Sequence, residues 1–186
     1  MRNIIVFAVI SLLLLGGCNT ETTGGTDGEK PSSITNTISA QYEFDEFAVE
    51  IKSAKEVYEH GEPVDVKVTL HNKTEQTIVI GHAGSWVGLA TTDLTRNYQY
   101  GYAMIEPYIV TSIKPGETIS ETYRFSGGSY SDDMPGNPYK NKDMEKMGTL
   151  KFPKGQYEIT AYVDFWIDKT GQKFSTQLPP IVFEVK

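Results

Sequence analysis

Strict alternation of apolar and polar residues is the most regular pattern in this chain. Residues 64–70 read Val-Asp-Val-Lys-Val-Thr-Leu, and the polar turn residues His-Asn-Lys-Thr follow them. Successive side chains of a strand point to opposite faces, so this alternation predicts a half-buried strand. Alternation, or a short apolar run bounded by turn residues, predicts further strands at residues 47–52, 77–80, 107–113, 117–125, 156–165 and 181–185.

The turns between these segments fit a protein built almost entirely from strands. Pro115-Gly116 and Pro153-Lys154-Gly155 combine the fixed φ of proline with the positive φ that glycine tolerates. No segment has a sustained helical stripe, and residues 143–147 are expected to form one helical turn at most. We therefore predict an all-β fold, an antiparallel immunoglobulin-like β-sandwich of about seven to nine strands. Tyr157 is either a tyrosine-corner residue of this sandwich or an ordinary core or rim aromatic residue.

The beginning of the chain has the pattern of an export signal. Arg2 precedes an apolar run at residues 4–15, which is too short to span a bilayer as a helix, and small residues follow it. Residues 1–17 are therefore predicted to be a signal peptide. Residues 18–40 are rich in Thr, Ser and Gly and are predicted to be a flexible tether, and residues 41–186 the β-sandwich domain.

The order Leu15-Gly16-Gly17-Cys18 resembles the lipobox of bacterial lipoproteins. The resemblance implies that the Cys18 thiol receives diacylglycerol and that cleavage makes Cys18 the N-terminus. Cys18 is also the only cysteine, so we expect no disulfide. Two or more acyl chains hold a protein durably on a membrane. The expected location is the extracytoplasmic face of a cell membrane, with Cys18 as the anchor.

Composition and charge narrow the class of partner. The chain has 39% hydrophobic and 22% charged residues, which is ordinary for a globular protein. It has 17 basic and 24 acidic residues, a net charge of -7. Binding to a phosphate backbone requires clustered Lys and Arg. Nucleic acid is therefore not expected as a partner.

A family resemblance rests on the order of several motifs. A strand that ends in Asn at residues 64–72 is followed by a polar bend, a second strand at residues 77–80, Pro-Gly-Glu at residues 115–117, and Gly-Gln-Tyr-Glu-Ile-Thr-Ala at residues 155–161. Together these segments resemble the bacillary intracellular proteinase inhibitor (BsuPI-type) family over about residues 63–161. The resemblance implies a sandwich fold and a proteinase as partner.

Signatures of catalysis and of metal binding are not found in the sequence. It has no P-loop and no His-Glu-x-x-His motif, and Ser85 is one position away from a nucleophile elbow. His60 falls in a turn, whereas His71 and His82 end successive strands and are expected at opposite edges of a sheet. We therefore expect an exposed turn position for each histidine, no enzyme activity, no cofactor and no metal site. Whether oxygen donors in residues 126–148 bind calcium is left open.

A long segment at residues 126–148 is the first candidate binding surface. It has no strand pattern, and such segments in compact domains are usually functional or mobile loops. Tyrosine and methionine are common contact residues at interfaces. The candidate partner-binding residues are Tyr130, Asp132, Asp133, Met134 and Tyr139.

An aromatic cluster is the second candidate. Tyr98, Tyr100 and Tyr102 recur at period two and are predicted to share one face of a strand, with Trp86 nearby. Such a face can stack on sugar rings, and packing inside the sandwich is the other interpretation. The predicted function is a membrane-tethered extracytoplasmic binding module of proteinase-inhibitor type, whose partner is a proteinase or another surface protein. The alternative is a lipoprotein that binds carbohydrate or a cell-wall ligand through the aromatic face.

Overall fold

The computed structural model of the protein describes residues 38–127 and 136–186, which belong to one compact unit, Ile34–Lys186. The predicted signal peptide, Cys18 and most of the predicted tether lie outside the described residues. The same holds for Tyr130, Asp132, Asp133 and Met134. No helix in the described ranges is long and apolar enough to cross a membrane.

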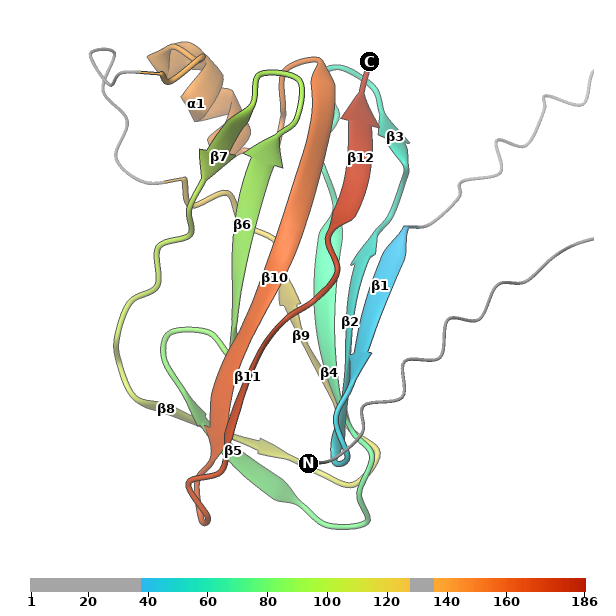
Figure 1. Cartoon of the computed structure of the whole chain (residues 1–186), viewed down its shortest axis with the longest axis vertical. Coiled ribbons are helices and arrows are strands. Elements are labelled where there is room, and N and C mark those ends of the chain that lie inside the picture. The colour runs from blue at the N-terminus through green and yellow to red at the C-terminus, as the bar shows by residue number, and fades with distance from the viewer. Residues whose placement is uncertain (1–37, 128–135) are drawn as a thin grey trace, which may run out of the picture. The chain divides into compact units, whose positions relative to one another are not determined.

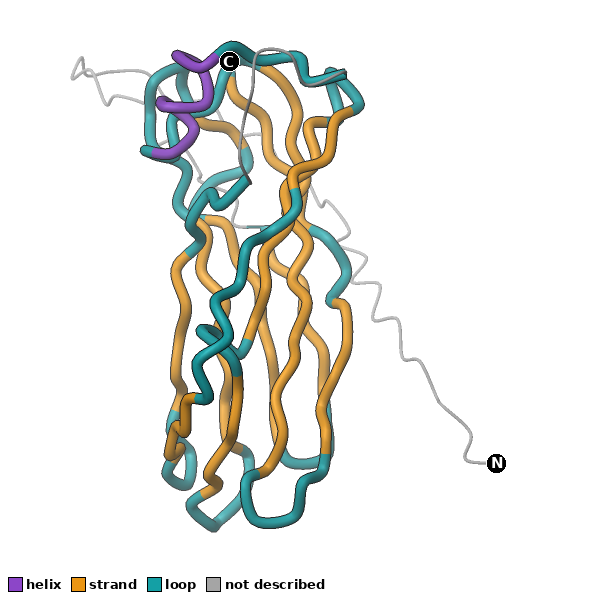
Figure 2. Tube along the Cα trace, turned by 90° about the vertical axis from the view of Figure 1, so that its left-hand side faces the viewer, coloured by secondary structure: helices purple, strands orange, loops and turns teal. Residues whose placement is uncertain are grey.

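The described residues form two sheets that pack face to face as a sandwich (Figures 1 and 2). The smaller sheet is antiparallel throughout and has the order β1-β2-β4-β9. Its strands are β1 (Ser39–Glu43), β2 (Phe47–Ser53), β4 (Val66–Asn72) and β9 (Thr118–Thr122). The predicted all-β sandwich is therefore confirmed.

The larger sheet is organised around β10 (Gly155–Ile167). Along one edge β10 pairs with β11 and β12, and along the other with β5 and β6. Outside these lie β7 on β6, β8 on β5, and β3 on β12, the last in parallel orientation. The strands are β3 (Val57–Tyr58), β5 (Ile78–His82), β6 (Val87–Asp93), β7 (Tyr98–Tyr100), β8 (Ile109–Ile113), β11 (Lys173–Gln177) and β12 (Ile181–Val185).

Inward-facing side chains of both sheets meet in one apolar core. On β2 the alternate residues Phe47, Val49 and Ile51 are buried, as the sequence pattern predicts. The Phe47 ring packs edge-on against Phe165 of β10 and Phe174 of β11, at centroid distances of 5.3 and 5.4 Å. These contacts join the two sheets, and edge-to-face geometry is favourable for aromatic pairs.

Two features differ from the sequence predictions. The described residues form twelve strands where about seven to nine were expected, because β1, β3 and β11 are short or polar and β6 has no clear alternation. The segment at residues 143–147 belongs to the helix α1 (Asn141–Gly148), which is longer than one turn. Its buried Met147 docks it at the end of the sandwich where the chain terminates (Figures 1 and 2).

Candidate functional site

A buried carboxylate closes one end of the sandwich. Asp93, the last residue of β6, is fully buried. Its Oδ1 accepts the backbone N–H of Arg96, and its Oδ2 accepts Arg96 Nη1, both at 2.9 Å. The Tyr139 hydroxyl donates to the same Oδ2 and accepts from Arg96 Nη1 at 2.8 Å. The carboxylate is thus paired with a cation and hydrogen-bonded, as a buried charge must be.

Tyr157 forms the tyrosine-corner contact. Its hydroxyl donates to Pro153 O, four residues upstream, at 2.7 Å, which confirms that interpretation of the sequence. Arg96 Nη2 also donates to Lys154 O at 2.9 Å. Burial raises the pKa of the Tyr157 and Tyr139 hydroxyls, so both remain neutral hydrogen-bonding groups at physiological pH.

Tyr139 does not have the role predicted for it. Its side chain is only 4% exposed, and it lies in the network around Asp93 instead of on a contact surface. Its ring also lies 5.0 Å from the Arg96 guanidinium. Tyr139 therefore holds the chain just before α1 against the sandwich, and its side chain is not available to a partner.

The predicted aromatic face is not formed as expected. Trp86 and Tyr100 are 2% and 4% exposed and belong to the core. Tyr98 and Tyr100 share a face of β7, with ring centroids 4.9 Å apart, but β7 ends at Tyr100 and the period of two ends with it. Tyr102, past Gly101, is 41% exposed. Of the four predicted residues only Tyr102 is well exposed.

A different set of aromatic rings lies on the outer face of the larger sheet. Tyr102 lies over Gly88, where an added Cβ would come within 2.2 Å of its ring. Gly88 is the register partner of Tyr162, and Tyr102 stacks on Tyr162 at 5.7 Å between centroids. The Tyr102 ring thus covers the glycine that lies opposite Tyr162 on the neighbouring strand.

The same arrangement recurs one strand pair further along. Trp166 lies over its register partner Gly81, where an added Cβ would come within 2.5 Å of the indole. Tyr108 stacks on Trp166 at 5.6 Å. We call these four rings the outer aromatic row: Tyr102, Tyr162, Trp166 and Tyr108. The sequence carried a partial signal for half of it, because Tyr162 lies on the predicted strand at residues 156–165 and Trp166 follows directly, four residues from Tyr162 and so on the same face once β10 extends to Ile167.

Residues 101–108 connect β7 to β8 and hold Tyr102 and Tyr108 in place. The connection is fixed where Ile105 O accepts the N–H of Gly84 at 2.9 Å and where Ser126 Oγ accepts the N–H of Ala103 at 3.2 Å. The connection itself contains no strand and runs down the left side of Figure 1 from β7 to β8. This segment forms one wall of a cleft.

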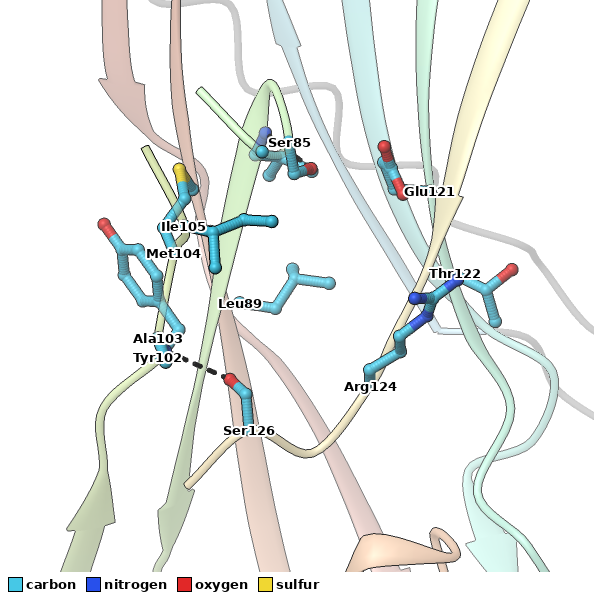
Figure 3. A pocket seen from close by; sticks show the side chains of 13 residues that line it. Ser85, Leu89, Tyr102, Ala103, Met104, Ile105, Glu121, Thr122, Arg124 and Ser126 are labelled. Carbon is cyan, nitrogen blue, oxygen red and sulfur yellow. Dashed lines mark hydrogen bonds between the residues drawn. The ribbon is translucent and has the colours of Figure 1, made fainter. Parts of the chain in front are cut away.

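The cleft lies between β6 of the larger sheet and β9 of the smaller one, and we call it the lateral cleft (Figure 3). Its volume is about 260 Å³. Leu89 of β6 is half-buried at its floor, and the Ile105 side chain is 73% exposed at its wall. Residues that line it include Leu89, Met104, Ile105, Glu121, Arg124 and Ser126.

Two charged side chains lie at the cleft on the side of β9. Figure 3 shows Glu121 and the Arg124 guanidinium on the same stretch of chain. Neither forms an ion pair with another residue in the described ranges. The cleft therefore combines an aliphatic floor with one carboxylate and one guanidinium that can interact with a ligand.

The histidines are dispersed, but only His60 has the predicted exposed position in a turn. His71 Nδ1 and Thr118 Oγ1 are 3.0 Å apart, whereas His82 contacts Ala83 O and Thr111 Oγ1 at 2.7 and 2.8 Å. His71 is half-buried within β4 of the smaller sheet, and His82 is buried at the end of β5 of the larger sheet. The prediction of exposed turn positions at opposite edges of one sheet is therefore wrong for both. The described residues contain no group of three or more His, Cys, Asp or Glu side chains that could hold a metal ion.

Comparisons with known proteins give only distant likenesses. The sequence matches no family model and no curated protein. Among solved structures, target SoR45 of the Northeast Structural Genomics Consortium aligns with a TM-score of 0.36 and 11% identity, over 81% of this chain and 84% of that one. A beta-glucosidase from Listeria innocua in complex with gluconolactone aligns with a TM-score of 0.32 and 12% identity, over 82% of this chain but 16% of that one. At these values the likeness indicates no function, and the resemblance to proteinase inhibitors stays a prediction.

Proposed function

We propose that this chain is a non-enzymatic binding module, anchored by lipid on Cys18 at the extracytoplasmic face of a membrane, which holds a polypeptide partner in the lateral cleft. The observation that carries the proposal is the cleft itself, with its aliphatic floor beside two charges that lack ion-pair partners among the described residues. The anchor is supported by the lipobox-like order of residues 15–18.

The chemistry of the lining favours a protein partner. Met and Arg are enriched at protein interfaces, and Met104 and Arg124 both line the cleft. Exposed aliphatic area such as that of Ile105 gains free energy when a partner covers it, and an isolated guanidinium recognises a carboxylate in bidentate geometry. These groups suit binding and orientation of a polypeptide.

A proteinase is the first partner to test, because of the family resemblance in the sequence. The assay titrates a subtilisin-like proteinase with the full chain purified in detergent, and compares Arg124→Glu with Lys169→Glu. Lys169 is exposed in the turn after β10, so its variant makes the same change of charge away from the cleft. We expect inhibition that Arg124→Glu weakens at least tenfold and Lys169→Glu leaves unchanged.

Two results would count against this function. No inhibition at micromolar concentration would reject a subtilisin-like proteinase as the partner. Equal inhibition by the Arg124 and Lys169 variants would reject the lateral cleft as the contact surface.

The outer aromatic row supports a second candidate function, which is binding of a glycan. Tyr102 and Trp166 lie over glycines, and Tyr162 and Trp166 are spaced by roughly 13 Å along β10. Tyr102 and Tyr108, which stack on them, are exposed, and exposed aromatic rings can stack on the apolar faces of sugar rings. The test is cosedimentation with insoluble peptidoglycan, in which Tyr108→Ala should reduce binding and Tyr42→Ala, on the smaller sheet, should not. Unchanged binding by Tyr108→Ala would reject this surface.

A further inference from the structure

The strand β9 has one edge without a strand partner in the described part of the chain. It is the last strand of its sheet and pairs with β4 alone. The N–H of Tyr123, just after β9, donates to Val66 O at 2.8 Å. Bonds in an antiparallel ladder alternate along a strand. The odd-numbered residues therefore bond to β4, and the N–H and C=O groups of Thr118, Ser120 and Thr122 point away from it.

The lateral cleft separates this edge from a stretch of β6 that is unpaired on the side away from β10. β7 covers β6 only at residues 91–93, so residues 87–90 have no strand partner on the side away from β10 within the described ranges. Leu94, just after β6, donates its N–H to Gln156 O of β10, and bonds in an antiparallel ladder alternate. The even-numbered residues of β6 therefore bond to β10. The backbone of Leu89 thus points away from β10, and its half-buried side chain lies at the floor of the cleft. The lateral cleft therefore lies between the free edge of β9 in the smaller sheet and the unpaired edge of β6 in the larger sheet.

The edge of β9 carries one charged residue, Glu121, but no Lys, no Pro and no β-bulge. Edges are usually protected by Lys, Pro or a β-bulge. β9 reads Thr-Ile-Ser-Glu-Thr and keeps a regular five-residue register with β4. A second strand of about five residues, roughly 17 Å long, would match it and form about six backbone hydrogen bonds with its three outward-pointing residues.

Charge identifies the occupant that fits this edge. Arg124 follows β9, is exposed, and has no ion-pair partner among the described residues, so it can receive a carboxylate. A second copy of this chain is a poor candidate, because each copy carries a net charge of -7 and self-pairing would bring two Glu121 carboxylates toward each other. A foreign segment that places its acidic residue opposite Arg124 avoids bringing two Glu121 carboxylates together.

We propose that an extended polypeptide segment adds as a strand to β9, with an apolar side chain against Leu89 and Ile105 and a carboxylate on Arg124. This inference rests on the proposed function and specifies how the partner is bound. Recognition by strand addition takes its affinity from main-chain bonds and its specificity from pockets for alternate side chains.

The test begins with random twelve-residue peptides displayed on phage and selected on the full chain immobilised in detergent. Enriched peptides are synthesised, and their Kd values are measured with wild type, Ser120→Pro and Ser120→Ala. Proline at residue 120 removes an outward-pointing donor without removing a bond to β4. We expect Ser120→Pro to weaken binding at least tenfold and Ser120→Ala to change it less than twofold. Arg124→Glu should weaken binding of peptides that carry a carboxylate.

A measurement on the peptide keeps the test valid if Ser120→Pro disturbs the fold. Peptides methylated on one backbone nitrogen at a time should lose affinity at every second position, because only alternate N–H groups face β9. The proposal is overturned if no peptide enriches over the detergent blank, or if methylation has no alternating effect. Selected peptides that bind without this alternation would reject strand addition while leaving the binding function in place. A dimer that Ser120→Pro dissociates would assign the edge to a second copy.

Discussion

Removing the Tyr139 hydroxyl is expected to destabilise the sandwich, and this prediction tests the role assigned to the buried network. The Tyr139→Phe substitution keeps the ring and its contact with the Arg96 guanidinium, 5.0 Å from the ring centroid. It removes the donor to Asp93 Oδ2 and the acceptor for Arg96 Nη1. Asp93 keeps its two bonds from Arg96, so the carboxylate is not left unpaired.

The size of the effect is worked from the lost bond to Asp93 alone, because Arg96 Nη1 keeps its bond to Asp93 Oδ2 when the Tyr139 hydroxyl is removed. A hydrogen bond to a charged group contributes about 1.5–3 kcal/mol to the free energy of unfolding. One kcal/mol corresponds to a change in Tm of about 2–4 °C for a domain of this size. We therefore expect the Tm of Tyr139→Phe to fall by about 3–12 °C. In urea, the midpoint should fall while the m-value stays constant.

Tyr108→Phe is the matched control. The Tyr108 hydroxyl also donates to an aspartate, Asp168, but this bond is exposed to solvent. Its loss should leave the urea midpoint unchanged, because water replaces the partner. A Tyr139→Phe protein as stable as the wild type would refute the reasoning, since burial is what distinguishes the two bonds. Equal losses from both variants would refute it as well.

Three further predictions concern pH, packing and the anchor. Burial raises the pKa of Tyr139 above its ordinary value of 10.0, so the stability that this group contributes is fully present below pH 10 and is lost as the pH rises further. The loss is about 1.4 kcal/mol per pH unit for each such tyrosine. Urea titrations above pH 10 should therefore show a shallower pH dependence of stability for Tyr139→Phe than for the wild type, and identical slopes would contradict this. Gly88→Ala should displace the Tyr102 ring and lower the free energy of unfolding by about 1–3 kcal/mol. Gly101→Ala should not, because a Cβ added there meets no atom within 4 Å. Thermal melts measure both effects, and a Gly88→Ala/Tyr102→Ala double variant should recover most of the loss. Cys18→Ser should leave the N-terminal peptide without lipid in mass spectra, and wild-type protein that carries no lipid there would exclude the anchor.

Much of the sheet structure was predictable from the sequence because the strands that bury one face alternate. Residues 64–70 predicted most of β4, and the pattern at residues 156–165 predicted most of β10. β6 has no clear alternation, because both of its faces are covered: Leu89 faces the cleft and the core, while Gly88 lies under Tyr102. Only the tertiary structure supplies the ring that covers the second face.

The helix α1 was underestimated for a similar reason. It has no side-chain cap at its N-terminus, and within Asn141–Gly148 only Met147 is buried, so the sequence contains little of the usual helical signal. Docking of Met147 against the end of the sandwich, and the anchoring of Tyr139 just before the helix, stabilise it instead.

The sequence by itself determined the all-β class and the positions of the main strands, because these depend on side-chain period and turn residues close in the chain. It left two interpretations of Tyr157 open, and only the structure shows its hydroxyl donating to Pro153 O. It did not determine which aromatic residues reach the surface. Trp86 and Tyr100 are as apolar in the sequence as Tyr102, but Trp86 lies in the core and Tyr100 packs against Phe125 and Tyr139. Tyr102, beyond the end of β7, lies instead over Gly88 and is exposed. The lateral cleft likewise arises where β6 and β9, separated by more than twenty residues in the chain, become neighbouring edges of two sheets, because sheet pairing is decided by the burial of both faces and not by local sequence.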